Sequence, residues 1–288
     1  MQLKHRLYEL AVTNPLAIAG FLAAVHGKKP KTIREDFCGT AALARGWLQL
    51  ANELNLPGSH QIGTHVGAVG VDNDRSVLKQ IPKADGFRAI ASDVMNCRKK
   101  TDVIAATNFP VCYFHERGDL IKYLKHVRSC LNPRGVFACD LFGGKDAFTP
   151  GITRIKIPAG PVIASAKQAK QKSLREKSLK RFFWYEWHQR ECHSLTGRVR
   201  CEINFELPAG SVFNDSGKAK RIERAFTYDW RLWSIPEMRD AIHDAGFRTV
   251  EVYNSLAAGV DSENTLYVLP MREDDELTDP YVVYVVAR

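Results

Sequence analysis

The stretch Arg34–Ala44, REDFCGTAALA, decides how this chain folds. It places acids and a Cys-Gly-Thr turn between a strand-like segment at residues 32–37 and a helical segment at residues 40–54. Small residues at such a junction let the backbone approach a ligand closely, and the first N–H groups of a helix have no partner within it. We therefore expect a ligand-binding loop at the end of the first strand.

Outward from this stretch, strand-like and helical patterns alternate. The expected strands are residues 32–37, 67–71, 88–92, 103–107 and 136–142, and the expected helices are residues 15–26, 40–54, 74–80 and 117–131. Alternation of this kind predicts a doubly wound α/β fold, in which a mostly parallel sheet is covered by helices on both faces. Ligands of such folds bind at the carboxyl ends of the strands.

Beyond Asp140 the pattern changes. Residues 182–187, 198–206 and 225–233 have the aromatic or alternating character of β-strands and predict an antiparallel insertion. A capping box of Ser234 and Glu237 then begins a helix, and YVVYVVAR at the end reads as a buried strand. The expected organisation is an N-terminal helical cap, residues 1–30, and a main domain, residues 31–288, that carries the insertion at residues 144–233.

Two further expected strands end in carboxylates. Asp72 ends the strand that contains Gly70, and Asp93 follows the next strand. In folds of this class, an acid at the second strand accepts hydrogen bonds from ribose hydroxyls. An acid at the third strand is placed to receive an adenine amino group. Together with the Cys-Gly-Thr loop, these residues predict a nucleoside site.

The motifs EDFCGT, GVDND, ASDVM, DVIAATNF and LNPRGVFACDLF resemble those of the class I S-adenosylmethionine-dependent methyltransferases. Within that superfamily, the chain is most similar to a bacterial subgroup that opens with LYELAVxNP and carries EDFCGTA. The resemblance spans nearly the whole chain. It implies a Rossmann-like, seven-stranded sheet with an antiparallel seventh strand, and S-adenosylmethionine as the methyl donor.

The resemblance also implies which residues hold the donor. Glu35 and Asp36 are alternatives for contacting its methionyl amino group. The expected donor-binding residues are Glu35, Asp36, Cys38, Gly39, Thr40, Asp72, Asn73, Asp93, Val94, Asn108 and Phe109. The chain departs from the family pattern at Phe37 and Ala41, which stand where glycine is common, and in an apparent insertion at residues 52–65.

A nicotinamide-binding Rossmann fold is the nearest competitor, because it also joins a first strand to a helix and uses an acid at the second strand. Its fingerprint requires GxGxxG, whereas this loop contains only Gly39. Glycines let the backbone approach a pyrophosphate. Because the methyl donor has no phosphate, the low glycine content favours the methyltransferase interpretation.

Methyl transfer from a sulfonium is an in-line displacement that requires alignment of the reactants and exclusion of water, and no metal. A base within reach would take a proton from an amine or hydroxyl acceptor. By position, the candidate catalytic residues are Tyr113, His115 and Asp140. The expected acceptor-side lid residues are Tyr8, Trp184, Tyr185, Tyr228 and Trp230, whose rings would exclude water and attract a cation.

The net charge of +9 is concentrated in residues 154–181, which hold nine Lys and Arg against one acid, Glu176. The rest of the chain carries about +1, which does not support a groove-wide basic field. The favoured acceptor is therefore a small molecule, methylated on nitrogen or oxygen. The alternatives are a tRNA or rRNA methyltransferase that docks through the basic segment, with Lys167, Lys170 and Lys172, and a non-catalytic donor-binding protein.

Composition bounds the remaining possibilities. The chain is 45% hydrophobic and 25% charged, as in an ordinary globular protein. The seven cysteines form no zinc or disulfide pattern, and no secretion signal or membrane span is evident, so a cytoplasmic protein without a membrane partner is expected. The sequence specifies neither the acceptor nor the oligomeric state.

Overall fold

A computed structural model describes residues 1–53, 55–159, 180–214 and 217–288. The chain divides into two compact units. The insertion unit comprises Met1–Val12 and Phe148–Asp229, and the sheet unit comprises Thr13–Ala147 and Trp230–Arg288.

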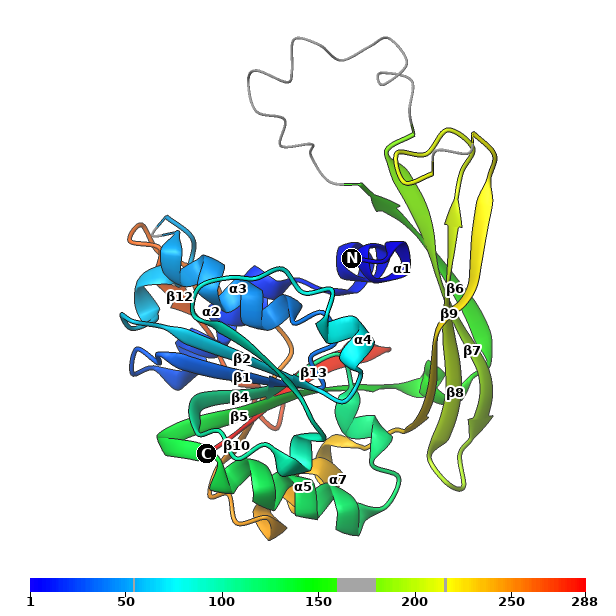
Figure 1. Cartoon of the computed structure of the whole chain (residues 1–288). Coiled ribbons are helices and arrows are strands. Elements are labelled where there is room, and N and C mark those ends of the chain that lie inside the picture. The colour runs from blue at the N-terminus through cyan, green and yellow to red at the C-terminus, as the bar shows by residue number, and fades with distance from the viewer. Residues whose placement is uncertain (54, 160–179, 215–216) are drawn as a thin grey trace, which may run out of the picture. The chain divides into compact units, whose positions relative to one another are not determined.

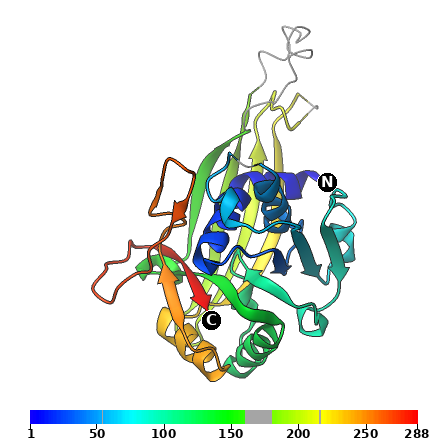
Figure 2. The same cartoon turned by 90° about the vertical axis from the view of Figure 1, so that its left-hand side faces the viewer.

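The sheet unit is built on seven strands in the order β10-β13-β5-β4-β1-β2-β3. Their bounds are β1 Thr32–Asp36, β2 Gly67–Asp72, β3 Phe87–Ala91, β4 Thr101–Ala106, β5 Leu131–Gly143, β10 Val250–Tyr253 and β13 Tyr281–Ala287. Strands β1 to β5 pair in parallel, whereas β13 runs antiparallel between β5 and β10, as Figure 2 shows. The predicted seven-stranded, mostly parallel sheet is confirmed.

Helices cover both faces of this sheet, which confirms the doubly wound prediction. The bounds are α2 Pro15–His26, α3 Ala42–Asn52, α4 Arg75–Leu78, α5 Arg117–Ser129 and α7 Ile235–Asp244. Helices α2 and α3 lie on one face, and α5 and α7 lie on the other (Figure 1). Phe21 and Trp47 from the first pair are fully buried in the same core as Ile33 and Val103 of the sheet.

The ends of these helices follow from local chemistry. Helix α7 begins at the predicted capping box, in which the Ser234 side chain accepts from the Glu237 N–H and the Glu237 side chain accepts from the Ser234 N–H. Helix α2 begins at Pro15 and ends at His26, and Gly27 caps it with a φ of 68°, which suits a residue without a side chain. A short hairpin of β11, Gly259–Val260, and β12, Leu266–Tyr267, completes the unit.

The insertion unit is a four-stranded sheet in the order β6-β7-β8-β9, with α1. The bounds are β6 Gly151–Pro158, β7 Phe182–His193, β8 Arg198–Leu207, β9 Lys220–Arg231 and α1 Leu3–Val12. Leu7 of α1 is fully buried against Phe183 and Phe205 of the sheet. The predicted antiparallel insertion is present, but the sequence interpretation missed β6, which lies in a segment read as irregular.

The segment predicted as an N-terminal cap, residues 1–30, is shared between the two units. Residues 1–12 belong to the insertion unit because the apolar face of α1 packs on β7 and β8. Residues 13–30 belong to the sheet unit because α2 lies in its core.

Within the described residues, no single helix is long and apolar enough to cross a membrane, and only α1 and α2 counted together reach that length. Over the same residues, no group of three His, Cys, Asp or Glu side chains is placed to hold a metal ion.

Candidate functional site

Hydrogen bonds draw the carboxyl ends of three neighbouring strands together. The Cys38 N–H donates to the carbonyl oxygen of Val71 at 3.0 Å, and the Gly39 N–H donates to Asp72 Oδ2 at 2.8 Å. The Ser92 N–H donates to the carbonyl oxygen of Asp72 at 2.9 Å. The loop after β1, the end of β2 and the end of β3 therefore form one edge, as the spacing of the motifs predicts.

Glycines shape this edge in two different ways. Gly39 has a φ of +50°, and a Cβ placed there would meet nothing within 4 Å, so the loop opens onto free space. Gly70 lies beneath the loop, where a Cβ would come within 2.8 Å of Cys38 Sγ and 3.1 Å of Ala41 Cβ. The loop thus packs tightly against β2 and leaves its outer side accessible.

Glu35 acts on the helix that follows the loop. Its buried carboxylate accepts a hydrogen bond from the Ala44 N–H in the first turn of α3, at 2.8 Å. A carboxylate at this place satisfies an otherwise unpaired N–H group and complements the helix dipole. Glu35 therefore fixes the angle between β1 and α3.

The side chain of Asp36, one of the two alternatives for contacting the methionyl amino group of the donor, is fully buried. Arg34 Nε lies 2.9 Å from Asp36 Oδ1, Arg34 Nη2 donates to Asp36 Oδ2 at 2.9 Å, and the Tyr123 hydroxyl donates to Oδ2 at 3.0 Å. Arg34 Nη1 also donates to the carbonyl oxygen of Cys97 at 3.0 Å. Asp36 is the centre of a structural network below the loop.

The acids of β2 and β3 organise the backbone that follows them. Asp72 Oδ1 accepts from the Asp74 N–H at 2.8 Å, while Oδ2 holds Gly39, and the side chain remains half-buried. The exposed Asp93 accepts from the Met95 N–H at 2.8 Å. Asn73 is exposed and Val94 is buried. Asp72 and Asp93 each keep accessible lone pairs at the strand edge.

The turn after β4 has an unusual backbone. Asn108 and Phe109 both adopt left-handed conformations, with φ of 69° and 65°, which cost a non-glycine residue roughly 1–2 kcal/mol each. Their N–H groups donate to Asp140 at 2.7 Å each, one to Oδ2 and the other to Oδ1. Burial raises the pKa of Asp140 to about 7, although these two hydrogen bonds oppose the rise.

These contacts do not favour the predicted role of Asp140 as a catalytic base, which stays a prediction. Only 4% of the residue is exposed, and each carboxylate oxygen already accepts from the backbone. A base must reach the proton of the acceptor. Asp140 instead holds the Asn108–Phe109 turn.

An aromatic corner of Phe109, Tyr113, Phe142 and Trp230 lies beside this turn. The Phe109 ring centroid is 5.7 Å from that of Trp230 and 6.3 Å from that of Phe142, and the Tyr113 ring is 6.4 Å from that of Trp230. All three contacts are edge-to-face. Sequence reasoning missed Phe142, which reads as an ordinary strand residue.

Of the remaining catalytic candidates, Tyr113 is 48% exposed, and burial of its hydroxyl raises its pKa. His115 is half-buried, and its carbonyl oxygen accepts from Arg231 Nη1 at 2.8 Å. Both residues follow the Asn108–Phe109 turn in the sheet unit. Tyr113 is therefore a hydrogen-bond donor over the physiological pH range, which leaves His115 as the candidate base.

Four of the expected lid residues belong to the insertion unit. Tyr8 packs on Phe226 with ring centroids 4.9 Å apart, and Tyr185 packs on Phe205 at 6.2 Å. The other two residues also have ring contacts: Tyr228 lies 5.8 Å from the ring of Trp187, and Trp184 lies beneath the guanidinium of Arg154 at 4.6 Å. A lid role for these four stays a prediction, whereas Trp230 belongs to the aromatic corner.

No family model and no curated protein matches this sequence. Solved structures do match its fold. The structure of SAM-bound CalS10, an amino pentose methyltransferase from Micromonospora echinaspora, is 12% identical, with a TM-score of 0.64 and coverage of 100% of this chain and 97% of that one.

Two further structures agree with this match. An S-adenosylmethionine-dependent methyltransferase from Clostridium acetobutylicum is 12% identical, with a TM-score of 0.63 and coverage of 99% and 96% of the two chains. The sugar N-methyltransferase KedS8 from Streptoalloteichus is 12% identical, with a TM-score of 0.61 and coverage of 98% and 91%. The chain has the fold of the Rossmann-like methyltransferases. The sequence subgroup defined by EDFCGTA is a separate prediction.

Proposed function

We propose that this protein is an S-adenosylmethionine-dependent methyltransferase that methylates nitrogen or oxygen of a small molecule. The observation that carries the proposal is the hydrogen-bonded edge of Gly39 and Asp72 in a sheet unit whose fold matches that of solved methyltransferases. Fold alone does not define activity, so the proposal depends on what these residues can bind.

The residues at the edge fit an adenosyl ligand. Gly39 leaves open space on the outer side of the loop, where a ligand can approach the backbone. The half-buried Asp72 presents a carboxylate suited to ribose hydroxyls, and Asp93 on the neighbouring strand suits an amino group. Phe37 stands where a phosphate-binding loop needs glycine, and its ring packs on Phe114 and Tyr123 instead. These features favour a ligand without phosphate.

S-adenosylmethionine supplies a methyl group on a sulfonium, which is already a good leaving group. The protein has to align the acceptor and keep water out. The Asn108–Phe109 turn and the aromatic corner provide apolar walls in the sheet unit, and aromatic faces attract cations by about 0.5–2 kcal/mol. His115 removes the acceptor proton, and the Tyr113 hydroxyl donates a hydrogen bond that orients the acceptor.

The acceptor class is supported by two observations. KedS8 and CalS10, which share the fold over nearly their whole lengths, are described as acting on a sugar and an amino pentose. Within the basic segment at residues 154–181, the described Arg154 is paired with Glu206 at 2.7 Å, and Lys156 lies over the Phe182 ring at 4.1 Å. Both side chains are engaged within the insertion unit, which weakens the case for a nucleic acid at these two of the segment's four described basic residues, the others being Lys180 and Arg181.

The RNA alternative remains testable. Lys167, Lys170 and Lys172 lie outside the described residues. An RNA methyltransferase would bind tRNA or rRNA with a steep salt dependence that weakens when these three lysines are neutralised. Binding of the small-molecule enzyme to its acceptor would not change.

The activity is tested by release of S-adenosylhomocysteine with a panel of amino sugars, amines and hydroxylated metabolites. We expect turnover with at least one acceptor, a loss of kcat of roughly 100-fold or more in His115→Ala, and a smaller loss in Tyr113→Phe. The kcat of Tyr113→Phe should keep the pH profile of the wild type. Donor binding without turnover on any acceptor would favour the non-catalytic alternative.

A further inference from the structure

Asp140, at the carboxyl end of β5, is only 4% exposed, and within the described residues no positively charged side chain pairs with its carboxylate. Its two oxygens accept from two consecutive backbone N–H groups, those of Asn108 and Phe109, at 2.7 Å each. In the part of the chain that the structure describes, backbone N–H groups alone offset the cost of burying this charge. A buried carboxylate held in this way serves the backbone that it binds.

That backbone needs support. Asn108 and Phe109 are both left-handed, and neither is a glycine. Residues held in sparsely populated conformations persist only where their surroundings fix them, and they occur often at functional sites. The turn also sets the direction of the Phe109 ring, which contacts both Trp230 and Phe142. Releasing the two N–H groups would let the turn relax and displace this ring.

We propose that Asp140, as a carboxylate, is a positioning residue that locks the Asn108–Phe109 turn in the conformation needed to bind the methyl donor. The role in donor binding rests on the proposed function, whereas the lock itself is a property of the sheet unit alone. Asp140 touches no reacting atom in this account. It acts through the backbone of the turn.

Protonation of Asp140 should weaken its hold on the Asn108–Phe109 turn, which makes the lock detectable by a change of pH. Because burial raises the pKa of this carboxyl to about 7, it is largely neutral below that pH. A neutral carboxyl keeps one good acceptor oxygen, and its hydroxyl has to donate, so one of the two N–H groups loses its partner. The titratable neighbours are Cys139 on the same strand and Tyr284, the register partner of Asp140 on β13, and burial raises the pKa of both. Both stay uncharged near neutral pH.

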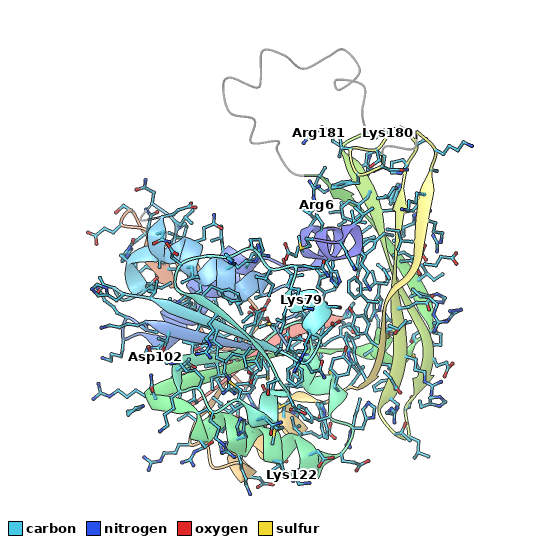
Figure 3. All side chains as sticks on the ribbon, viewed as in Figure 1. Arg6, Lys79, Asp102, Lys122, Lys180 and Arg181 are labelled. Carbon is cyan, nitrogen blue, oxygen red and sulfur yellow. The ribbon has the colours of Figure 1, made fainter. Side chains whose placement is uncertain are left out.

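The chain contains a matched control for this lock. Asp102, on β4, also holds two consecutive backbone N–H groups, those of Lys31 at 2.8 Å and Thr32 at 3.0 Å. It lies at the amino end of the strands, away from the candidate site (Figure 3). Despite partial burial, hydrogen bonds from Asn132, Lys31 and Thr32 lower the pKa of Asp102, so this carboxylate stays charged near neutral pH.

The first experiment uses the unmodified protein without donor. Hydrogen exchange at single-amide resolution is measured at about pH 6 and about pH 8, with rates corrected for intrinsic exchange. We expect protection of the Asn108 and Phe109 amides to fall at the lower pH, while protection of the Lys31 and Thr32 amides does not. An equal response of the two pairs would overturn the proposal.

The second experiment compares Asp140→Asn with Asp102→Asn by calorimetric titration with S-adenosylmethionine. Loss of a hydrogen bond to a charged group predicts a Kd raised roughly 10- to 100-fold in Asp140→Asn and within about twofold of wild type in Asp102→Asn. Wild-type Kd should rise below about pH 7, and that of Asp140→Asn should not. Equal Kd values for the two variants would refute the role in donor binding. If the wild type bound no donor, the proposed function would fail, and the exchange data alone would decide whether the lock exists.

Discussion

Gly39 and Asp72 are joined by a hydrogen bond of 2.8 Å from the backbone N–H of one to Oδ2 of the other. The bond links the loop after β1 to the end of β2. Because Asp72 Oδ1 also holds the Asp74 N–H, one carboxylate fixes the two loops on either side of the proposed ribose position.

Replacing Asp72 with Asn should weaken donor binding more than it weakens the fold. The amide has one acceptor oxygen for two N–H groups and loses the charge that ribose hydroxyls would meet. We expect the Kd for S-adenosylmethionine to rise roughly 10- to 100-fold, with a change in the free energy of unfolding of about 1 kcal/mol. Titration calorimetry and urea unfolding measure the two effects. A Kd within a factor of about two of wild type would remove Asp72 from the donor site.

Gly70→Ala should disturb the loop from below. The added Cβ would lie 2.8 Å from Cys38 Sγ, and over-packing of this kind costs roughly 1–3 kcal/mol. The double variant Gly70→Ala/Cys38→Ala removes the sulfur, so we expect it to recover part of the lost stability and donor affinity. A double-mutant cycle tests this coupling. Additive effects of the two substitutions would show that the contact with Cys38 is not what requires glycine.

The sequence predicts the scaffold of this edge well and its individual contacts less well. The alternation of strands and helices and the order of the strand-end motifs determine which residues reach the edge, so Gly39, Asp72 and Asp93 are placed together as predicted. Glu35 and Asp36 are adjacent acids, and the sequence leaves both open. All residues of β1 after Thr32 are buried. What distinguishes Asp36 is its pairing with Arg34 on the same strand and with Tyr123, which is distant in the sequence.

Other features depend on conformations that residue type does not specify. Phenylalanine rarely adopts a positive φ, so the sequence does not show that Phe109 lies in a left-handed turn. It also does not show that this turn needs Asp140. Strand β6 was missed because its alternating ITRIKI stretch lies between prolines and a basic run, although pairing with β7 makes it a strand. Which side of α1 faces a core depends on the distant sheet against which Leu7 packs, so the sequence of the helix does not show it.

Asp36→Asn should destabilise the protein by roughly 3–5 kcal/mol, because it leaves the Arg34 guanidinium buried without a counter-charge. Tyr123→Phe removes one hydrogen bond to the same carboxylate and should cost about 1.5–3 kcal/mol. Chemical denaturation measures both. In the fraction that stays folded, donor affinity of Asp36→Asn should change little, since the side chain is not accessible to a ligand. A large loss of affinity at wild-type stability would contradict the structural role.

Stability should depend on pH through Asp140. Its pKa in the folded protein is raised from 3.8 to about 7, so the native state binds this proton more tightly than the unfolded chain does. The stabilising contribution is complete below the unfolded pKa and is lost as pH rises to about 7. Relative to Asp140→Asn, the wild type should lose roughly 1–3 kcal/mol between about pH 5 and about pH 8. This trend is opposite in sign to the pH dependence of donor binding, because protonation relieves a buried charge but removes an acceptor from the turn. If the wild type instead gained stability relative to Asp140→Asn as the pH rises, the assignment would be refuted.

The most direct test of the donor site is a calorimetric titration of the 288-residue chain with S-adenosylmethionine, alongside Asp72→Asn. We expect one donor per chain with a Kd between about 1 μM and about 1 mM, and weaker binding by the variant. No binding by the wild type at millimolar donor, or equal binding by both proteins, would contradict the assignment of the strand edge as the donor site.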